Sequence, residues 1–224
     1  MQAFLALWND VASGREAEYE RWHTFEHVPE RVAVPGMRGA RRYVDRTRAR
    51  HRYFTLYEAD DAGVFECAEY LDLVRNPTAW SASMRPDLLN LVRAPCAVAG
   101  SQGFGMGGAV AVMCYEHGAR DPDAVATAIR EAAGVIAWHC GIRPAGDGAP
   151  PWRVGVEEPT RPFDRVLIVE ALERNAASAA MRIAQRTLQL DADDDFGGAV
   201  YDLAFAFPGH DPASRQRFRR AGWR

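Results

Sequence analysis

The order of strand and helix patterns repeats along the chain, and this repeat limits the fold more than any other feature. The first copy has the order βαββαβ, with strand patterns at 4–9, 37–44, 52–58 and 94–102 and helix patterns at 15–30 and 62–74. The second copy has the same order, at 109–115, 121–133, 135–142, 165–171, 176–188 and 199–207. The sequence therefore predicts two copies of one supersecondary unit.

Each copy on its own would be a ferredoxin-like antiparallel sheet with helices on one face and an uncovered apolar face. Because the chain is 48% hydrophobic, two such sheets can pack face to face around a proper core. We expect an α+β protein in which tandem duplicated ferredoxin-like halves form an intramolecular α/β barrel. Residues 1–106 would be the first half, carrying the site, 107–208 the second half, and 209–224 a basic C-terminal tail. Duplication removes the need for a partner chain to close the barrel, and a homodimer remains an alternative.

Several motifs of the first half carry a family resemblance. They are Trp22-His23, Glu26-His27, Pro29-Glu30-Arg31, Pro35-Gly36, Ala40-Arg41-Arg42-Tyr43, Tyr70-Leu71 and Asn76-Pro77-Thr78-Ala79-Trp80. Together they resemble the EthD-like branch of the dimeric α/β-barrel superfamily over about residues 1–105, while the second half matches only in element order. The resemblance implies a fold more closely than a reaction, because the superfamily includes cofactor-independent monooxygenases, polyketide cyclases, muconolactone isomerases, dehydratases and haem enzymes.

Imidazole, carboxylate and aromatic side chains concentrate on the first predicted helix. At roughly 100° per residue, Glu26 falls in one arc with Trp22 and Phe25, and His23 and His27 lie along its edge. A carboxyl group among aromatic rings loses solvation, and an acid tuned in this way beside an imidazole suits proton transfer near neutral pH. The alternative left open is an amphipathic helix whose acids are bridged by arginines for packing alone.

The strand that follows offers polar groups on both of its faces. Alternation sends Arg41 and Tyr43 to one face and Arg42 to the other, so only one set can face a pocket. Tyr43 could donate a hydrogen bond to a carbonyl or enolate while an arginine binds an acidic substituent. We expect Trp80 in the wall of the cavity and His139 as a contribution from the second half; for each, a packing role remains open.

These side chains predict acid–base chemistry on a small molecule. The expected catalytic residues are His27 as general acid or base, His23 and Glu26, which set its charge, and Tyr43. The expected substrate-binding residues are Trp22, Arg41, Arg42, Trp80 and His139. We predict a cofactor-independent lyase, isomerase or cyclase acting on a small hydrophobic or aromatic metabolite. The alternatives are a non-enzymatic small-molecule-binding or accessory protein and a cofactor-free monooxygenase with an electron-rich phenolic substrate.

Two motifs suggest a metal or a cofactor, and both are incomplete. The run from His23 to His27 matches the His-x-x-Glu-His pattern of inverted zinc proteases, but nothing singles out a third ligand. The glycines at 103–108 match the dinucleotide spacing, but a strand pattern follows them where a helix is needed. All 27 Lys+Arg residues are arginine, which excludes Schiff-base chemistry on lysine. We therefore predict no metal and no cofactor.

Charge and hydropathy narrow the partners and the compartment. A net charge of -3 gives no general attraction to nucleic acid, and we interpret the five arginines between Arg215 and Arg224 as a frayed or partner-docked terminus. No apolar run approaches the roughly 18 residues of a membrane span, and the first residues lack a signal-peptide pattern. The sequence predicts a cytoplasmic protein without nucleic-acid or membrane partners, acting on a small molecule.

Overall fold

The computed structural model describes residues 1–116, 118, 122–144, 162–192 and 194–209. Within these residues, eight strands form one closed barrel with the order β1-β3-β2-β8-β5-β7-β6-β4, and every pairing is antiparallel. The strands are β1 Ala3–Val11, β2 Met37–Val44, β3 Tyr53–Ala59, β4 Leu88–Gly103, β5 Ala109–Tyr115, β6 Val135–Ile142, β7 Arg165–Ala171 and β8 Ala199–Pro208. The predicted α+β class and the intramolecular barrel are confirmed.

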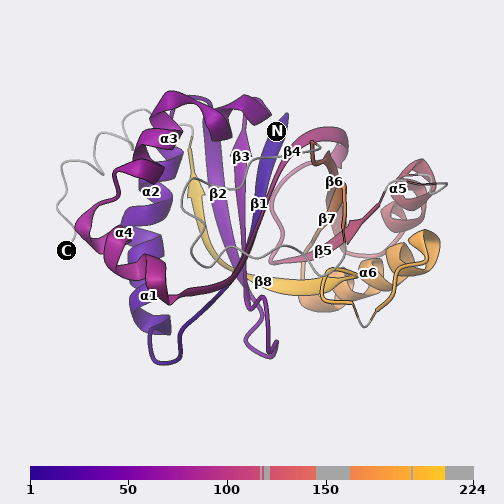
Figure 1. Cartoon of the computed structure of the whole chain (residues 1–224). Coiled ribbons are helices and arrows are strands. Elements are labelled where there is room, and N and C mark those ends of the chain that lie inside the picture. Colours follow the sequence, from indigo (N-terminus) through magenta and orange to yellow (C-terminus); the bar gives the residue numbers. More distant parts are fainter. Residues whose placement is uncertain (117, 119–121, 145–161, 193, 210–224) are drawn as a thin grey trace.

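The helices cover the barrel on two opposite sides. They are α1 Glu16–Trp22, a π-helical segment His23–His27, α2 Val28–Val32, α3 Ala68–Arg75, α4 Ala79–Met84, α5 Pro122–Arg130 and α6 Arg174–Leu188, with short 3₁₀ turns at Ala62–Glu66 and Arg85–Asp87. Helices α1 to α4 gather on one side of the barrel, and α5 and α6 lie on the other (Figure 1). Each half therefore has its own layer between sheet and helices.

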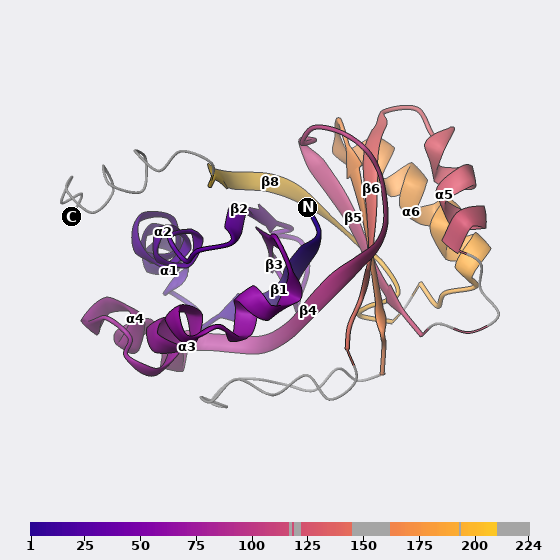
Figure 2. The same ribbon diagram turned by 90° about the horizontal axis from the view of Figure 1, so that it is seen from above.

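The strand order repeats in the two halves. Reading around the barrel, β4-β1-β3-β2 is followed by β8-β5-β7-β6, which is the same internal order twice. The halves join where β2 pairs with β8 and where β4 pairs with β6. The long strands β4 and β8 cross from one half to the other, as the view from above shows (Figure 2). The two halves are therefore joined by strand pairing at both junctions and by a common core inside the barrel.

Alternation along the strands creates an interior face and a helix-facing face. Inside the barrel, aromatic rings pack together: Trp8 and Phe54 have centroids 5.2 Å apart, and Phe54 and Tyr201 have centroids 5.6 Å apart. Leu5 and Tyr57 point the other way and pack under the helices of the first half. Residues on one strand can therefore serve two separate environments.

Several elements differ from the sequence-based expectation; the predicted helix over 62–74, for example, is a 3₁₀ turn followed by α3. Strand β4 begins at Leu88 instead of residue 94, because its first residues pair with the end of β1. Residues 79–84, expected in a loop around Trp80, form α4, and the side chain of Thr78 caps this helix by accepting a hydrogen bond from the Ser81 backbone N–H. No helix of the described part of the chain is long and apolar enough to cross a membrane. The predicted tail falls, beyond Gly209, outside the described residues.

Candidate functional site

A pocket of about 340 Å³ lies in the first half, between the sheet and the helices. Its wall is largely apolar and aromatic and includes Leu7, Tyr19, Trp22, Phe65 and Leu91. Polar side chains interrupt this wall, namely Asn9, His23, His27, Arg31, Tyr57, Glu66, Ser81, Arg85 and Arg93. A concave apolar site of this size with a few convergent polar groups has the form of a small-molecule site.

The π-helical segment positions the two histidines of the pocket. Its wide turn is seen where the backbone N–H of Val28 donates to the carbonyl of His23, five residues earlier. Pro29 has no N–H, so the regular helical hydrogen bond to Phe25 cannot form, and the wider turn accommodates this gap. The predicted single helix over 15–30 is therefore three segments, and the irregular one carries His23 and His27.

The imidazole rings of His23 and His27 are packed against aromatic rings and against each other. The centroid of His27 lies 4.4 Å from that of Trp22 and 5.4 Å from that of His23. The Nε2 atom of His23 lies 3.5 Å from the hydroxyl of Thr55. Among the described residues, the Nδ1 atoms of both rings are buried without a hydrogen-bond partner. Both rings therefore retain unused hydrogen-bonding capacity at the pocket.

Both histidines are neutral at pH 7. Burial, and then the positive charge of Arg42, hold the pKa of His23 well below its usual value. Burial, followed by the positive charge of Arg31, does the same for the pKa of His27. A neutral imidazole has one nitrogen that accepts a proton. The pair can therefore act as a base towards a bound molecule.

Glu26 does not face these imidazoles. Its carboxylate accepts hydrogen bonds from the hydroxyls of Thr78 and Ser81, the latter at 3.1 Å, and it borders a separate groove outside α2. The Ser81 hydroxyl also accepts a hydrogen bond of 3.1 Å from the indole Nε1 of Trp22. Glu26 is thus connected through Ser81 to the ring on which His27 stacks, and it fixes that ring without touching the pocket.

Tyr43 and Arg41 lie inside the barrel, on the opposite side of the sheet from the pocket. The guanidinium of Arg41 forms ion pairs with Glu58 and Glu170, and the hydroxyl of Tyr43 donates to Glu170 at 3.5 Å. Strand alternation explains this placement, since both side chains point away from the helices. The expected convergence of Tyr43 with His27 on one cavity therefore does not occur.

Three further predicted site residues also lie outside the pocket lining. Arg42 faces the helices, where it donates to the hydroxyl of Thr24 at 3.1 Å behind the His23 ring. Trp80 donates from Nε1 to Glu18 at 2.7 Å and ties α4 to α1. The Nδ1 atom of His139 lies 2.7 Å from the hydroxyl of Ser101, and burial together with Arg41 lowers the pKa of His139 to about 4.

The pocket contains functional candidates that the sequence-based interpretation missed. Arg31 and Tyr57 both line the pocket, and the sequence pattern assigns neither of them to the site. The guanidiniums of Arg31 and Arg93 lie over the ring of Tyr70, at 5.4 and 5.8 Å from its centroid. For Tyr57, the available signal was strand β3, where a threonine and two tyrosines place hydroxyls at alternate positions on one face of the strand.

The donor groups do not fit a metal site. No group of three or more His, Cys, Asp or Glu side chains in the described ranges could hold a metal ion. Glu26 points away from His23 and His27, so the zinc-protease pattern does not converge. His139, on β6, lies outside this pocket, with its Nδ1 atom beside the hydroxyl of Ser101. We derive no step through a metal or a cofactor.

The sequence matches no protein-family model and no curated protein. Solved structures share the fold: an anthrone oxidase-like protein has a TM-score of 0.58 and 10% identity over 93% of each chain. A chlorite dismutase from Candidatus Nitrospira defluvii, in complex with imidazole, has a TM-score of 0.53 and 9% identity over 97% of this chain and 95% of its own. A candidate monooxygenase from Fusobacterium nucleatum subsp. nucleatum has a TM-score of 0.51 and 11% identity, over 92% and 94%. These neighbours have the fold of the dimeric α/β-barrel superfamily, and so does this chain.

Proposed function

We propose that this chain is a cofactor-independent enzyme that moves protons on a small hydrophobic or aromatic metabolite, as a lyase, isomerase or cyclase of EthD-like type. The observation that carries the proposal is the pair of neutral imidazoles of His23 and His27, which border one pocket with unpartnered Nδ1 atoms. A base next to an apolar wall can remove a proton from carbon beside a carbonyl, or from a phenol.

His27 is the proposed general base, because it both lines the pocket and is held by Trp22. After accepting a proton its ring is positively charged, and the same burial and cations that lower its pKa disfavour that state. The proton therefore returns readily to another atom of the substrate. Transient proton storage of this kind suits isomerisation, cyclisation and elimination, in which a proton is removed and then replaced or passed on. In this scheme Glu26 positions Trp22 through Ser81.

The experiment is deuterium exchange, which needs no knowledge of the product. The purified protein is incubated in D₂O with a panel of aromatic ketones and phenols, and incorporation is followed by NMR. His27→Gln should lower the exchange rate by about 10²–10⁴-fold while the melting temperature stays within a few degrees. His139→Gln is the matched control, since this ring lies outside the pocket. Deuterium exchange that persists in His27→Gln would show that His27 is not the general base.

The aromatic wall of Tyr19, Trp22 and Phe65 favours a flat ring and so supports a second candidate function. The same base would deprotonate an electron-rich phenol, and the resulting phenolate would react with molecular oxygen in a cofactor-free oxygenation. Oxygen uptake that depends on His27 would select this function. A ligand that binds tightly and is returned without exchange or oxidation would instead identify a binding protein.

A further inference from the structure

We infer that the first-half pocket binds an organic anion, a carboxylate attached to an apolar ring, whose oxygens accept hydrogen bonds from Arg31 and Tyr57. The inference rests on the proposed function only in that the same pocket holds the substrate. It assigns a ligand class that acid–base chemistry alone does not require.

The first observation is a buried guanidinium that forms no ion pair within the described residues, although its charge acts on the half-buried carboxyl of Glu30. Arg31 is only 4% exposed, and its Nη1 atom is buried with no hydrogen-bond partner in the described part of the chain. None of the ion pairs between described residues includes Arg31. Arginine does not deprotonate in proteins, so burial cannot be relieved by loss of the charge. A buried charge of this kind is costly unless something pairs with it.

The barrel interior shows how this chain treats a buried arginine that serves structure. The side chain of Arg41 is 7% exposed, close to the exposure of Arg31, and it has carboxylates from both Glu58 and Glu170. A second buried arginine outside the pocket, Arg42, is 5% exposed and forms no ion pair among the described residues, but its guanidinium donates to the Glu20 carbonyl and the Thr24 hydroxyl. The Nη1 atom of Arg31 has neither kind of partner. The missing counter-ion of Arg31 is therefore expected from the molecule that fills the pocket.

The second observation is an unused hydroxyl in the same wall. Tyr57 is 2% exposed, and its OH has no partner among the described residues. Burial raises the pKa of Tyr57 well above its usual value, so the hydroxyl keeps its proton and can donate. An anionic oxygen satisfies an arginine N–H and a tyrosine O–H together, and hydrogen bonds to charged groups are the strong ones.

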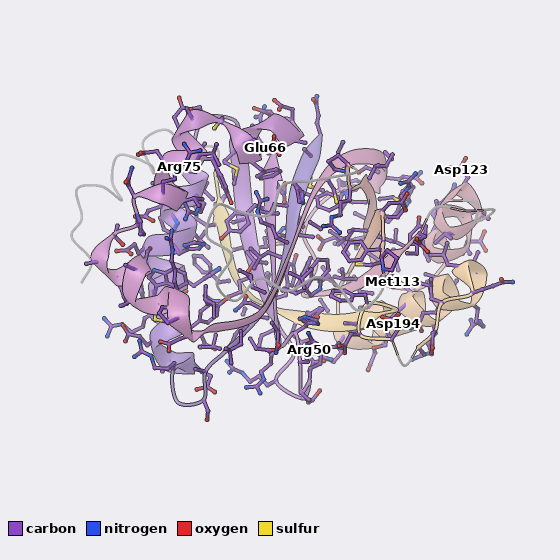
Figure 3. All side chains as sticks on the ribbon, viewed as in Figure 1. Arg50, Glu66, Arg75, Met113, Asp123 and Asp194 are labelled. Atoms are coloured by element: carbon purple, nitrogen blue, oxygen red, sulfur yellow. The ribbon has the colours of Figure 1, made fainter. Side chains whose placement is uncertain are left out.

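The surrounding charge is also positive. Arg31, Arg85 and Arg93 all line the pocket, and its one acidic lining residue, Glu66, is exposed at the end of the 3₁₀ turn before α3 (Figure 3). Stacking of Arg31 and Arg93 on Tyr70 holds these guanidiniums in place without a carboxylate. With neutral histidines, the field in the pocket attracts a negative group.

The test compares carboxylates with their uncharged amides on the full chain. Benzoate, 2-naphthoate and cyclohexanecarboxylate are titrated by calorimetry beside the amide of each. We expect at least one carboxylate to bind the wild type at least about tenfold more tightly than its amide, as one charged hydrogen-bond pair provides. Arg31→Gln should remove this preference, and Tyr57→Phe should reduce it. Arg75→Gln, an exposed site on α3 outside the pocket, removes the same charge and should keep the preference.

Thermal unfolding of each variant shows whether the fold survives. If Arg31→Gln does not fold, Arg31→Lys and Tyr57→Phe decide: the lysine keeps the charge and should retain part of the preference. If no carboxylate binds more tightly than its amide, or if Arg31→Gln retains the preference, the inference is overturned. The two proposals fail separately, because the preference for a carboxylate over its amide is measured on the wild type and on the Arg31 and Tyr57 variants, whereas proton exchange is measured on the His27 variant. Loss of proton exchange leaves the anion preference intact, and absence of the preference leaves His27-dependent exchange intact.

Discussion

The two halves of the barrel share one topology but use the layer between sheet and helices in opposite ways. In the first half this layer contains a pocket of about 340 Å³ with imidazole and guanidinium groups in its wall. In the second half, the described residues fill the same layer with apolar side chains, including Ala177, Ala180 and Ala184 of α6, each 0% exposed. Met113 of β5 belongs to this packed layer (Figure 3).

Helix construction explains the difference. Helix α6 is one continuous helix of 15 residues, and its alanines let it lie close to the sheet. In the first half, the helix position that corresponds to α6, between the third and fourth strands, is divided into the short helices α3 and α4, and the helix between the first and second strands is interrupted by the π-helical segment. Large rings such as Tyr19 and Trp22 then hold the helices away from the strands. The duplication therefore contains one copy whose layer is filled with apolar side chains and one whose pocket holds unpartnered imidazole, guanidinium and hydroxyl atoms, as functional sites do.

The largest expected effect comes from placing a phenylalanine ring in each layer. Leu7 and Ala111 lie on the first strand of each half and face the helices. Ala111→Phe should lower the free energy of unfolding by about 3 kcal/mol, because the second layer has no room. Leu7→Phe should change it by less than about 1 kcal/mol, since the ring enters the pocket, and it should weaken ligand binding. Urea denaturation measures both variants. Equal decreases in the free energy of unfolding would show that the two layers are packed alike and would contradict the difference between the halves.

A smaller effect is expected from pH. The pKa of His27 is lowered in the folded state, so below about pH 6.5 the unfolded chain binds more protons than the folded chain. Above that pH the ring of His27 does not change the free energy of unfolding. Below it, the free energy of unfolding falls by up to about 1.4 kcal/mol for each pH unit. His27→Gln should therefore flatten the dependence of unfolding free energy on pH between about 6.5 and 5. An unchanged slope would mean that the ring is not buried in its neutral form.

The barrel could be predicted from sequence because its signals are local. Alternation of apolar residues and turn residues at the ends define Met37–Val44, Ala109–Tyr115, Val135–Ile142 and Arg165–Ala171, and the structure gives these strands the same bounds. The repeated order then leaves few topologies. Local pattern and global fold agree here, which is why the prediction succeeded.

The site depends on distant contacts, and these have no local signal. Hydrogen bonds across 52 and 55 residues turn Glu26 away from the pocket. Alternation showed that Tyr43 and Arg42 face opposite ways, but it could not show which face meets the helices. The lack of an ion pair at Arg31 among the described residues is a matter of position in space, so no spacing in the sequence predicts it. The histidines could be proposed from sequence, whereas their partners required the fold.

The smallest effect compares two buried hydroxyls, one in each half. Tyr57 has an unpartnered OH, whereas the OH of Tyr115 lies 3.5 Å from the Sγ atom of Cys140. Tyr57→Phe should leave the free energy of unfolding unchanged or raise it by up to about 1 kcal/mol, because a buried group without a partner is removed. Tyr115→Phe should lower it by about 0.5 kcal/mol, because a weak hydrogen bond is lost.

With saturating 2-naphthoate, the wild type should become more stable than Tyr57→Phe. The wild-type hydroxyl then has an acceptor, so ligand binding stabilises the wild type more than the variant. Thermal unfolding with and without the ligand measures this reversal, and a Tyr57→Phe variant stabilised by the carboxylate as much as the wild type would contradict it.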